Sequence, residues 1–255
     1  MSLTRALARI PSTTLLGGIV RRLFRFFPRR PVEGIRTGPL RGRRWIVASG
    51  VNGYWLDTYE TEMQAAIARI VAPGGVFFDV GAHAGYYSLL ASQLVGAEGR
   101  VVAFEPDARN LGYLTEHLRL NNAGNVTVVE AAVADASGAA QFAAEESSFG
   151  GALSAAGSAT VDTVTIDRLM DAGTVSPPTY LKIDVEGAEF RVICGARKVL
   201  RTARPTVFLA THTPAVERLC LEALATLGYT VRPVARDAWL CVPPPAPGQS
   251  RRARG

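Results

Sequence analysis

Alternating apolar and amphipathic stretches divide most of the chain into predicted strands and helices. Short apolar runs bounded by glycine or polar residues predict buried strands at 76–80, 100–104, 126–130, 180–184 and 206–210. Apolar residues at helical spacing predict helices between them, at 85–95, 107–121, 188–200 and 215–227. This alternation predicts an α/β protein with a mostly parallel sheet, helices on both faces and a ligand site at the carboxyl ends of the strands.

Other segments depart from this rhythm. Residues 59–72 predict a helix that stops at Pro73-Gly74, and 136–160, rich in small residues, predict a loop or hairpin insertion. Residues 160–166 alternate like an edge strand, and a short helix follows at 166–170. The stretches 229–232 and 238–242 predict an antiparallel pair that closes the sheet at seven strands.

Length and charge distribution limit the possible partners. A chain of 255 residues is long enough for one large core. The net charge is +6, but residues 1–44 and the last six carry 14 of the 28 basic groups and 1 of the 22 acidic ones. The body, 45–249, is left with a net charge of −7. A groove that follows phosphates needs basic groups on the folded body, so nucleic acid is disfavoured as the substrate.

These shifts in composition predict three regions. Residues 1–36 form a basic amphipathic leader, residues 37–243 the main domain, and residues 244–255 a Pro/Arg-rich disordered tail. Within the main domain we expect a lead-in over 37–73 and a core over 74–243.

The leader bears on the expected location of the protein. Its longest uncharged stretch, Ile10 to Val20, is too short to span a bilayer, and arginines follow where a secretory signal has its cleavage site. The three isolated cysteines also indicate a reducing, cytoplasmic setting. Phenylalanines among the arginines leave peripheral membrane contact open, beside packing on the folded domain or a frayed tail.

The turn after the first core strand indicates a cationic ligand. Its sequence, Asp79-Val-Gly-Ala-His-Ala-Gly85, has Gly81 for a tight turn and Gly85 for a helix start close to a ligand. A dinucleotide fold has G-x-G-x-x-G there, whereas this spacing is G-x-x-x-G with an acid two residues before it. Asp79 would repel a pyrophosphate and attract a sulfonium or ammonium group.

Two further strand ends carry acids. Glu105, at the end of the second strand, is placed to accept both ribose hydroxyls of an adenosine-containing ligand. Asp184 and Glu186 follow the fourth strand, where they could hold a divalent cation, face a sulfonium or take a proton from a hydroxyl, or serve as a helix cap.

Four motifs together resemble the FkbM-type methyltransferase family. They are DVGAHAGYYS (79–88), AFEP (103–106), NVTVVEAAVAD (125–135) and LKIDVEGAE (181–189), within a match over roughly 37–235. The resemblance implies a class I methyltransferase Rossmann-like fold, S-adenosylmethionine as donor, and O-methylation of a hydroxyl on a sugar, glycan, polyketide or other secondary metabolite. It also implies that His83 and Asp135 belong to the cofactor site.

The chain departs from the family after the fifth strand. Many members have Glu-Ile-His there, whereas this chain has Ala210-Thr-His-Thr-Pro214, so only His212 is present. We therefore treat Asp184, Glu186 and His212 as the candidate catalytic residues. Either these groups hold Mg²⁺ or Mn²⁺, with Asp184 and Glu186 as ligands, or His212 acts as a base without metal. The alternatives to this function are a nucleic-acid methyltransferase, a non-catalytic module that binds the donor, and an NAD oxidoreductase.

Overall fold

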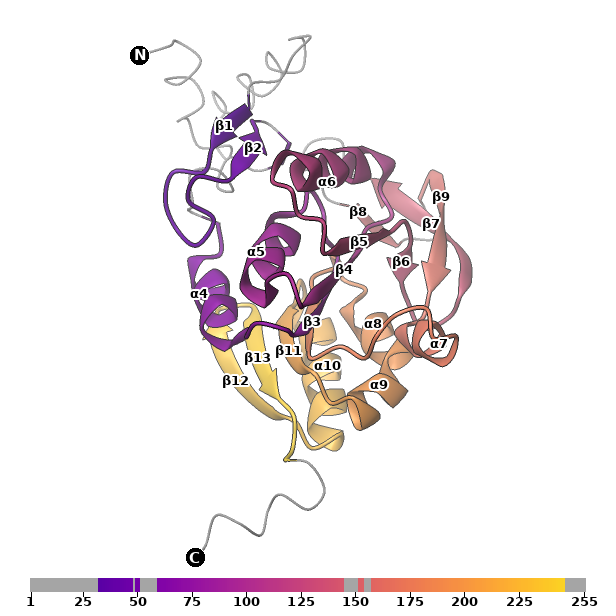
Figure 1. Ribbon diagram of the computed structural model, residues 1–255. Helices are drawn as coiled ribbons and strands as arrows, with labels where there is room; N and C mark the ends of the chain where they lie inside the picture. The colour runs from indigo at the N-terminus through magenta and orange to yellow at the C-terminus, as the bar shows by residue number, and fades with distance from the viewer. Residues whose placement is uncertain (1–31, 48, 51–58, 145–150, 154–156, 246–255) are drawn as a thin grey trace, which may run out of the picture.

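The computed structural model describes residues 32–47, 49–50, 59–144, 151–153 and 157–245 (Figure 1). Most of the predicted leader and tail lie outside these stretches. None of the helices within them is long and apolar enough to span a bilayer.

A seven-stranded sheet forms the centre of the molecule. Its strands, in spatial order, are β12 (Thr230–Ala235), β13 (Ala238–Val242), β11 (Thr206–Ala210), β10 (Tyr180–Ile183), β3 (Val76–Val80), β4 (Arg100–Phe104) and β5 (Val126–Val129). The five strands from β11 to β5 run parallel, and β13 is antiparallel to both of its neighbours. The predicted mostly parallel seven-stranded sheet is confirmed.

Helices cover both faces of this sheet (Figure 1). Helices α4 (Thr61–Ile70), α5 (Tyr86–Val95) and α6 (Ala108–Leu120) contribute to one core, and α8 (Glu189–Gly195), α9 (Arg197–Thr202) and α10 (Pro214–Thr226) to the other. Successive strand residues point to opposite faces, so Phe77 joins the first core and Phe78 the second. Burial on both sides explains why these strands are continuous apolar runs.

Side-chain caps fix the starts of two predicted helices. Asp107 accepts a hydrogen bond from the backbone N–H of Asn110 and begins α6, and Thr213 accepts one from Val216 before α10, whose first residue is Pro214. The two antiparallel strands β12 and β13 follow α10 as predicted.

The insertion after β5 forms a second sheet. Strands β6 (Ala132–Val133), β9 (Ala159–Val164), β7 (Gly138–Ala144) and β8 (Gly151–Leu153) lie in that order, and β7 and β8 pair as an antiparallel hairpin. The prediction of an edge strand at 160–166 is wrong, because β9 lies between β6 and β7. Its polar alternation reflects a small sheet that is buried on one side only. The short helix α7 (Ile166–Asp171) follows as expected.

The predicted helix at 188–200 is wrong as a single element. The structure divides it at Ala196 into α8 and α9. Gly195 lies so close to the next layer that a Cβ atom there would be 2.0 Å from the carbonyl oxygen of Ala134. The glycine that this contact requires also disfavours continuation of the helix.

The lead-in is attached to the core by an aromatic stack. Strand β1 (Val32–Gly34) pairs with β2 (Arg44–Ile46), and Trp45 of β2 stacks on His117 of α6 at a ring separation of 3.7 Å. Ile35 is buried, so the described fold includes residues 32–36, which the sequence pattern assigned to the leader. The prediction missed this because three residues are too few for a detectable alternation.

Candidate active site

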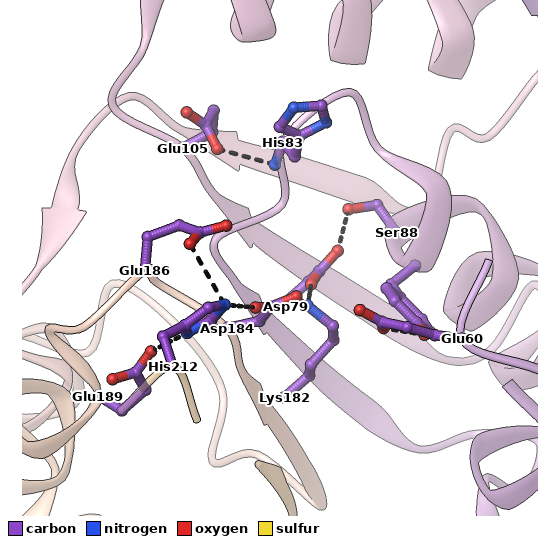
Figure 2. Close-up of polar contacts among 11 residues, drawn as sticks. Glu60, Asp79, His83, Ser88, Glu105, Lys182, Asp184, Glu186, Glu189 and His212 are labelled. Carbon is purple, nitrogen blue, oxygen red and sulfur yellow. Dashed lines mark hydrogen bonds and ion pairs between the residues drawn. The ribbon is translucent and has the colours of Figure 1, made fainter. Parts of the chain in front are cut away.

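The carboxyl ends of four neighbouring parallel strands bring the predicted site residues together (Figure 2). Asp79 lies near the end of β3, Glu105 follows β4, Asp184 follows β10, and His212 follows β11. Parallel strands end at the same edge of the sheet, which is why residues far apart in sequence meet here.

The turn after β3 lies directly against the turn after β10. Gly81 has φ +81, and a Cβ atom there would be 1.8 Å from the carbonyl oxygen of Asp184. Gly85 has φ +90 and precedes α5, where a Cβ atom would be 2.5 Å from Leu114. Gly81 therefore needs glycine for backbone conformation and for space, and Gly85 needs it for its positive φ.

Glu105 is held by backbone donors at the edge of a cavity. The N–H of His83 donates to Oε2 at 2.7 Å, and the N–H of Asp107 donates to Oε1 at 3.0 Å. Burial raises the pKa of Glu105 to about 7, although these hydrogen bonds favour the ionised form. The carboxylate is therefore held in place, and its pKa lies close to neutral pH.

The cavity beside Glu105 is lined by acids and by apolar residues. The empty space within it, its open mouth included, is about 680 Å³. Glu105, Asp184 and Glu186 contribute its acids. The apolar side includes Pro106, Ala131, Ala132, Val133, Phe142 and Leu153, the last two from the hairpin β7–β8.

Behind this cavity lies a buried group of charges. Asp79 accepts a 2.6 Å hydrogen bond from Ser88, and Nζ of Lys182 lies 3.7 Å from Oδ1 of Asp79 and 3.0 Å from Oδ2 of Asp184. Burial alone would raise the pKa of Asp184, but Lys182 and His212 together lower it. Burial raises the pKa of Asp79 despite the nearby Lys182.

Three carboxylates surround His212. Its Nδ1 lies 2.6 Å from Oε1 of Glu189, and its Nε2 lies 3.3 Å from Glu186 and 3.5 Å from Asp184. The hydrogen bond to Glu189 raises the pKa of His212 to about 9, with further contributions from Asp184 and Glu186. The imidazole is accordingly protonated at neutral pH.

The lead-in adds one more acid to this edge. Glu60, just before α4, accepts a 2.7 Å hydrogen bond from the hydroxyl of Tyr87. Burial raises the pKa of Glu60, and the charge of Asp184 raises it further.

Comparison with known proteins identifies the family to which this chain belongs. The family model described as "Methyltransferase FkbM domain" matches residues 79–231, more than half of the chain. The chain belongs to the FkbM methyltransferase family. The predicted family is thereby confirmed.

Individual relatives of this FkbM chain resemble parts of it. The hexuronic acid methyltransferase AglP of Haloferax volcanii is 30% identical over 129 residues, which are 50% of this chain and 52% of that protein. This chain thus matches about half the length of that relative. The crystal structure of methyltransferase FkbM from Methylobacillus flagellatus KT has a TM-score of 0.51 and 19% identity, and the match covers 77% of this chain and 53% of that one. A precorrin-6y C5,15-methyltransferase from Geobacter metallireducens GS-15 has a TM-score of 0.49 and 18% identity, over 72% of this chain and 88% of that one.

Only some of the residues predicted to bind the cofactor line the cavity of this FkbM protein. Gly81, His83 and Glu105 line it, whereas Asp79 and Gly85 support it from behind. Asp135 is not among the lining residues, and its carboxylate pairs with Arg191 at 2.7 Å on the surface. The family resemblance implied that Asp135 belongs to the cofactor site, but the chain turns there from β6 into the second sheet.

The catalytic candidates are brought together as predicted, with partners that the prediction missed. Asp184 and Glu186 line the cavity, and His212 contacts both. Glu189, Lys182 and Glu60 were missed. The first two stand inside the motif LKIDVEGAE, where a lysine in an apolar strand was the available signal. Glu60 had none, because only the fold brings it here.

Two other sets of side chains bear on the chemistry of the protein. Within the described residues, no group of three or more His, Cys, Asp or Glu side chains is arranged to hold a metal ion. Cys220 and Cys241 are buried, and burial raises the pKa of each thiol to about 12, which suits apolar filling rather than nucleophilic chemistry.

Proposed function

We propose that this protein transfers a methyl group from S-adenosylmethionine to a hydroxyl oxygen of a sugar, a glycan or another secondary metabolite. The observation that carries the proposal is the cavity beside Glu105. One wall offers a fixed carboxylate next to apolar residues, and the other offers Asp184 and Glu186. A nucleoside attached to a cation matches both walls.

The residues present fit the donor better than a dinucleotide. Glu105 can accept hydrogen bonds from both ribose hydroxyls, and the apolar wall suits a flat base. The carboxylates of Asp184 and Glu186 favour a positive sulfur and ammonium group and oppose a pyrophosphate. When bound, S-adenosylmethionine supplies a methyl group already activated by its positive sulfur.

The chain's own residues then align the acceptor and remove its proton. We assign Asp184 to accept the proton of the acceptor hydroxyl, whose oxygen would take the methyl group that the bound donor supplies. His212, protonated at neutral pH, serves in this assignment as the cation that faces Asp184 and Glu186. It can act as the base only after it has lost its own proton.

A metal-assisted version is the alternative mechanism. Mg²⁺ or Mn²⁺ on Asp184 and Glu186 would stabilise an acceptor alkoxide. We favour the metal-free version because each oxygen of Asp184 already faces a positive side chain, Lys182 or His212.

The acceptor class rests on the similarity to AglP and on the charge of the body. That relative's name describes a hexuronic acid methyltransferase, which supports a sugar or glycan acceptor here. The net charge of −7 over 45–249 counts against the second candidate, a nucleic-acid methyltransferase.

Calorimetry and a labelled donor test the proposal. We expect micromolar binding of S-adenosylmethionine and of S-adenosylhomocysteine, no measurable NAD binding, and label transfer to hydroxyl groups in a panel of uronic-acid-containing glycans, neutral sugars and polyketides. A matched panel of RNA should stay unlabelled. Tight NAD binding without a response to S-adenosylmethionine would overturn the donor, and binding without transfer to any compound would support a non-catalytic module.

A further inference from the structure

Lys182 is an unusual residue for its position. The chain contains 26 arginines and only two lysines, Lys182 and Lys198. Lys198 pairs with Asp171 on the surface, whereas the side chain of Lys182 is 3% exposed and lies in the middle of the sheet. A buried ammonium group is costly unless it is paired.

The sheet register places two acids at this ammonium group. Lys182 is the direct partner of Asp79 across β10 and β3, and Asp184 is two residues further along the same strand direction. The ammonium group lies 3.0 Å from Asp184 and 3.7 Å from Asp79 (Figure 2). It also lies 4.6 Å from the centre of the Tyr87 ring. Carboxylates and an aromatic face thus surround it.

The contact with Asp184 fixes one end of that carboxylate. Oδ2 faces Lys182, whereas Oδ1 faces His212 at 3.5 Å, and the residue lines the cavity. A carboxylate held from both ends has one orientation available, and alignment of this kind is what methyl transfer requires of the protein.

We propose that Lys182 is a positioning residue that acts through Asp184, holding its carboxylate in the orientation that meets the acceptor hydroxyl. This inference rests on the acceptor-side role of Asp184 proposed above. A compact ammonium group serves here because it reaches Asp184 and Asp79 at once, whereas the planar guanidinium preferred elsewhere in this chain is larger and directional.

A purely structural role explains the position less well. Apolar residues often replace a buried ion pair without loss of stability, so stability alone does not call for a lysine and two acids in the core. Within the described core, Lys182, Asp79 and Asp184 lie at or next to the ends of the two central strands, β10 and β3, beside the cavity.

A double-mutant cycle on the full chain tests the inference. Lys182→Met should lower kcat by roughly tenfold or more, and Lys198→Met, the matched control on the surface, should leave it unchanged. In the Asp184→Asn background, Lys182→Met should cost nothing further, because Lys182 has no carboxylate left to orient. Losses that multiply would overturn the inference. If Lys182→Met alone does not fold, Lys182→Arg takes its place in the cycle.

A second readout needs neither donor nor acceptor. With ¹³C-labelled lysine, the protein gives two Cε resonances, one for each lysine. Asp184→Asn should shift that of Lys182 and leave that of Lys198 in place. An unshifted Lys182 resonance would overturn the inference even in an active enzyme. If the wild type methylates no acceptor, the proposed function fails, and the resonances still report whether Lys182 holds Asp184.

Discussion

The backbone N–H of His83 donates a 2.7 Å hydrogen bond to Oε2 of Glu105. This bond joins the turn after β3 to the end of β4, so the position of the carboxylate depends on the backbone rather than on a mobile partner. Glu105 can then meet a ribose without first being ordered, which reduces the entropic cost of binding.

We expect Glu105→Ala to weaken binding of S-adenosylmethionine by about 1.5–3 kcal/mol, the scale of hydrogen bonds to a charged group. Because the ribose is common to donor and product, S-adenosylhomocysteine should lose about as much, which titration calorimetry can measure. Glu116→Ala, on the exposed face of α6, is the control and should change neither affinity. An unchanged affinity in Glu105→Ala would place the ribose elsewhere.

His117 should make the fold sensitive to acid. It is fully buried, its Nδ1 lies 2.7 Å from the carbonyl oxygen of Ala84, and its Nε2 accepts a hydrogen bond from the N–H of Ile46. Burial lowers the pKa of His117 from 6.5 to about 4 in the folded protein. Its contribution to stability is therefore complete above pH 6.5 and is lost as the pH falls toward 4.

The expected loss from this group is about 3 kcal/mol between pH 6.5 and pH 4. Urea unfolding at several pH values measures it, and His117→Gln should flatten the decline over that range while lowering stability at pH 7. An equally steep decline in the variant would assign the acid sensitivity to other groups.

Ser88 should stabilise the fold through Asp79. Both side chains are buried, and the hydroxyl donates to Oδ2 at 2.6 Å. Ser88→Ala leaves that carboxylate oxygen without its donor, so we expect a loss of about 1.5–3 kcal/mol in the free energy of unfolding. Thr226→Ala, which removes an exposed hydroxyl bonded to its own helix, is the matched control and should change stability little. Equal effects of the two would contradict a stabilising role for the hydrogen bond between Ser88 and Asp79.

Chelation distinguishes the two mechanisms at Asp184. We expect methyl transfer to persist in EDTA, because Lys182 and His212 already face the oxygens of Asp184. Asp184→Asn should lower kcat by roughly 100-fold or more, as expected for loss of a general base. Activity that disappears with EDTA and returns with Mg²⁺ or Mn²⁺ would favour the metal-assisted version.

The sequence predicted best those features that depend on the type of residue at one position or in one short run. Apolar runs such as 76–80 locate buried strands, and acids at their carboxyl ends, such as Glu105 and Asp184, indicate the site. The partners of His212 were harder to predict, because Glu189 lies in α8 and reaches the imidazole only where α8 packs against α10, the helix that follows His212. The central position of β9 depends on long-range pairing, which alternation along one strand does not encode.

The contact between Gly81 and Asp184 affects how mutational surveys of this family member should be interpreted. Any side chain at 81 displaces the carbonyl of Asp184 as well as the donor-side turn. A loss of activity in Gly81→Ala would therefore combine a binding defect with a displaced acceptor carboxylate, and a high-throughput screen would score both as one. Measurements of donor affinity and turnover on the same variant are needed to separate the two defects. A substitution at position 81 therefore affects the binding of both substrates together, and its effect cannot be assigned to either one alone.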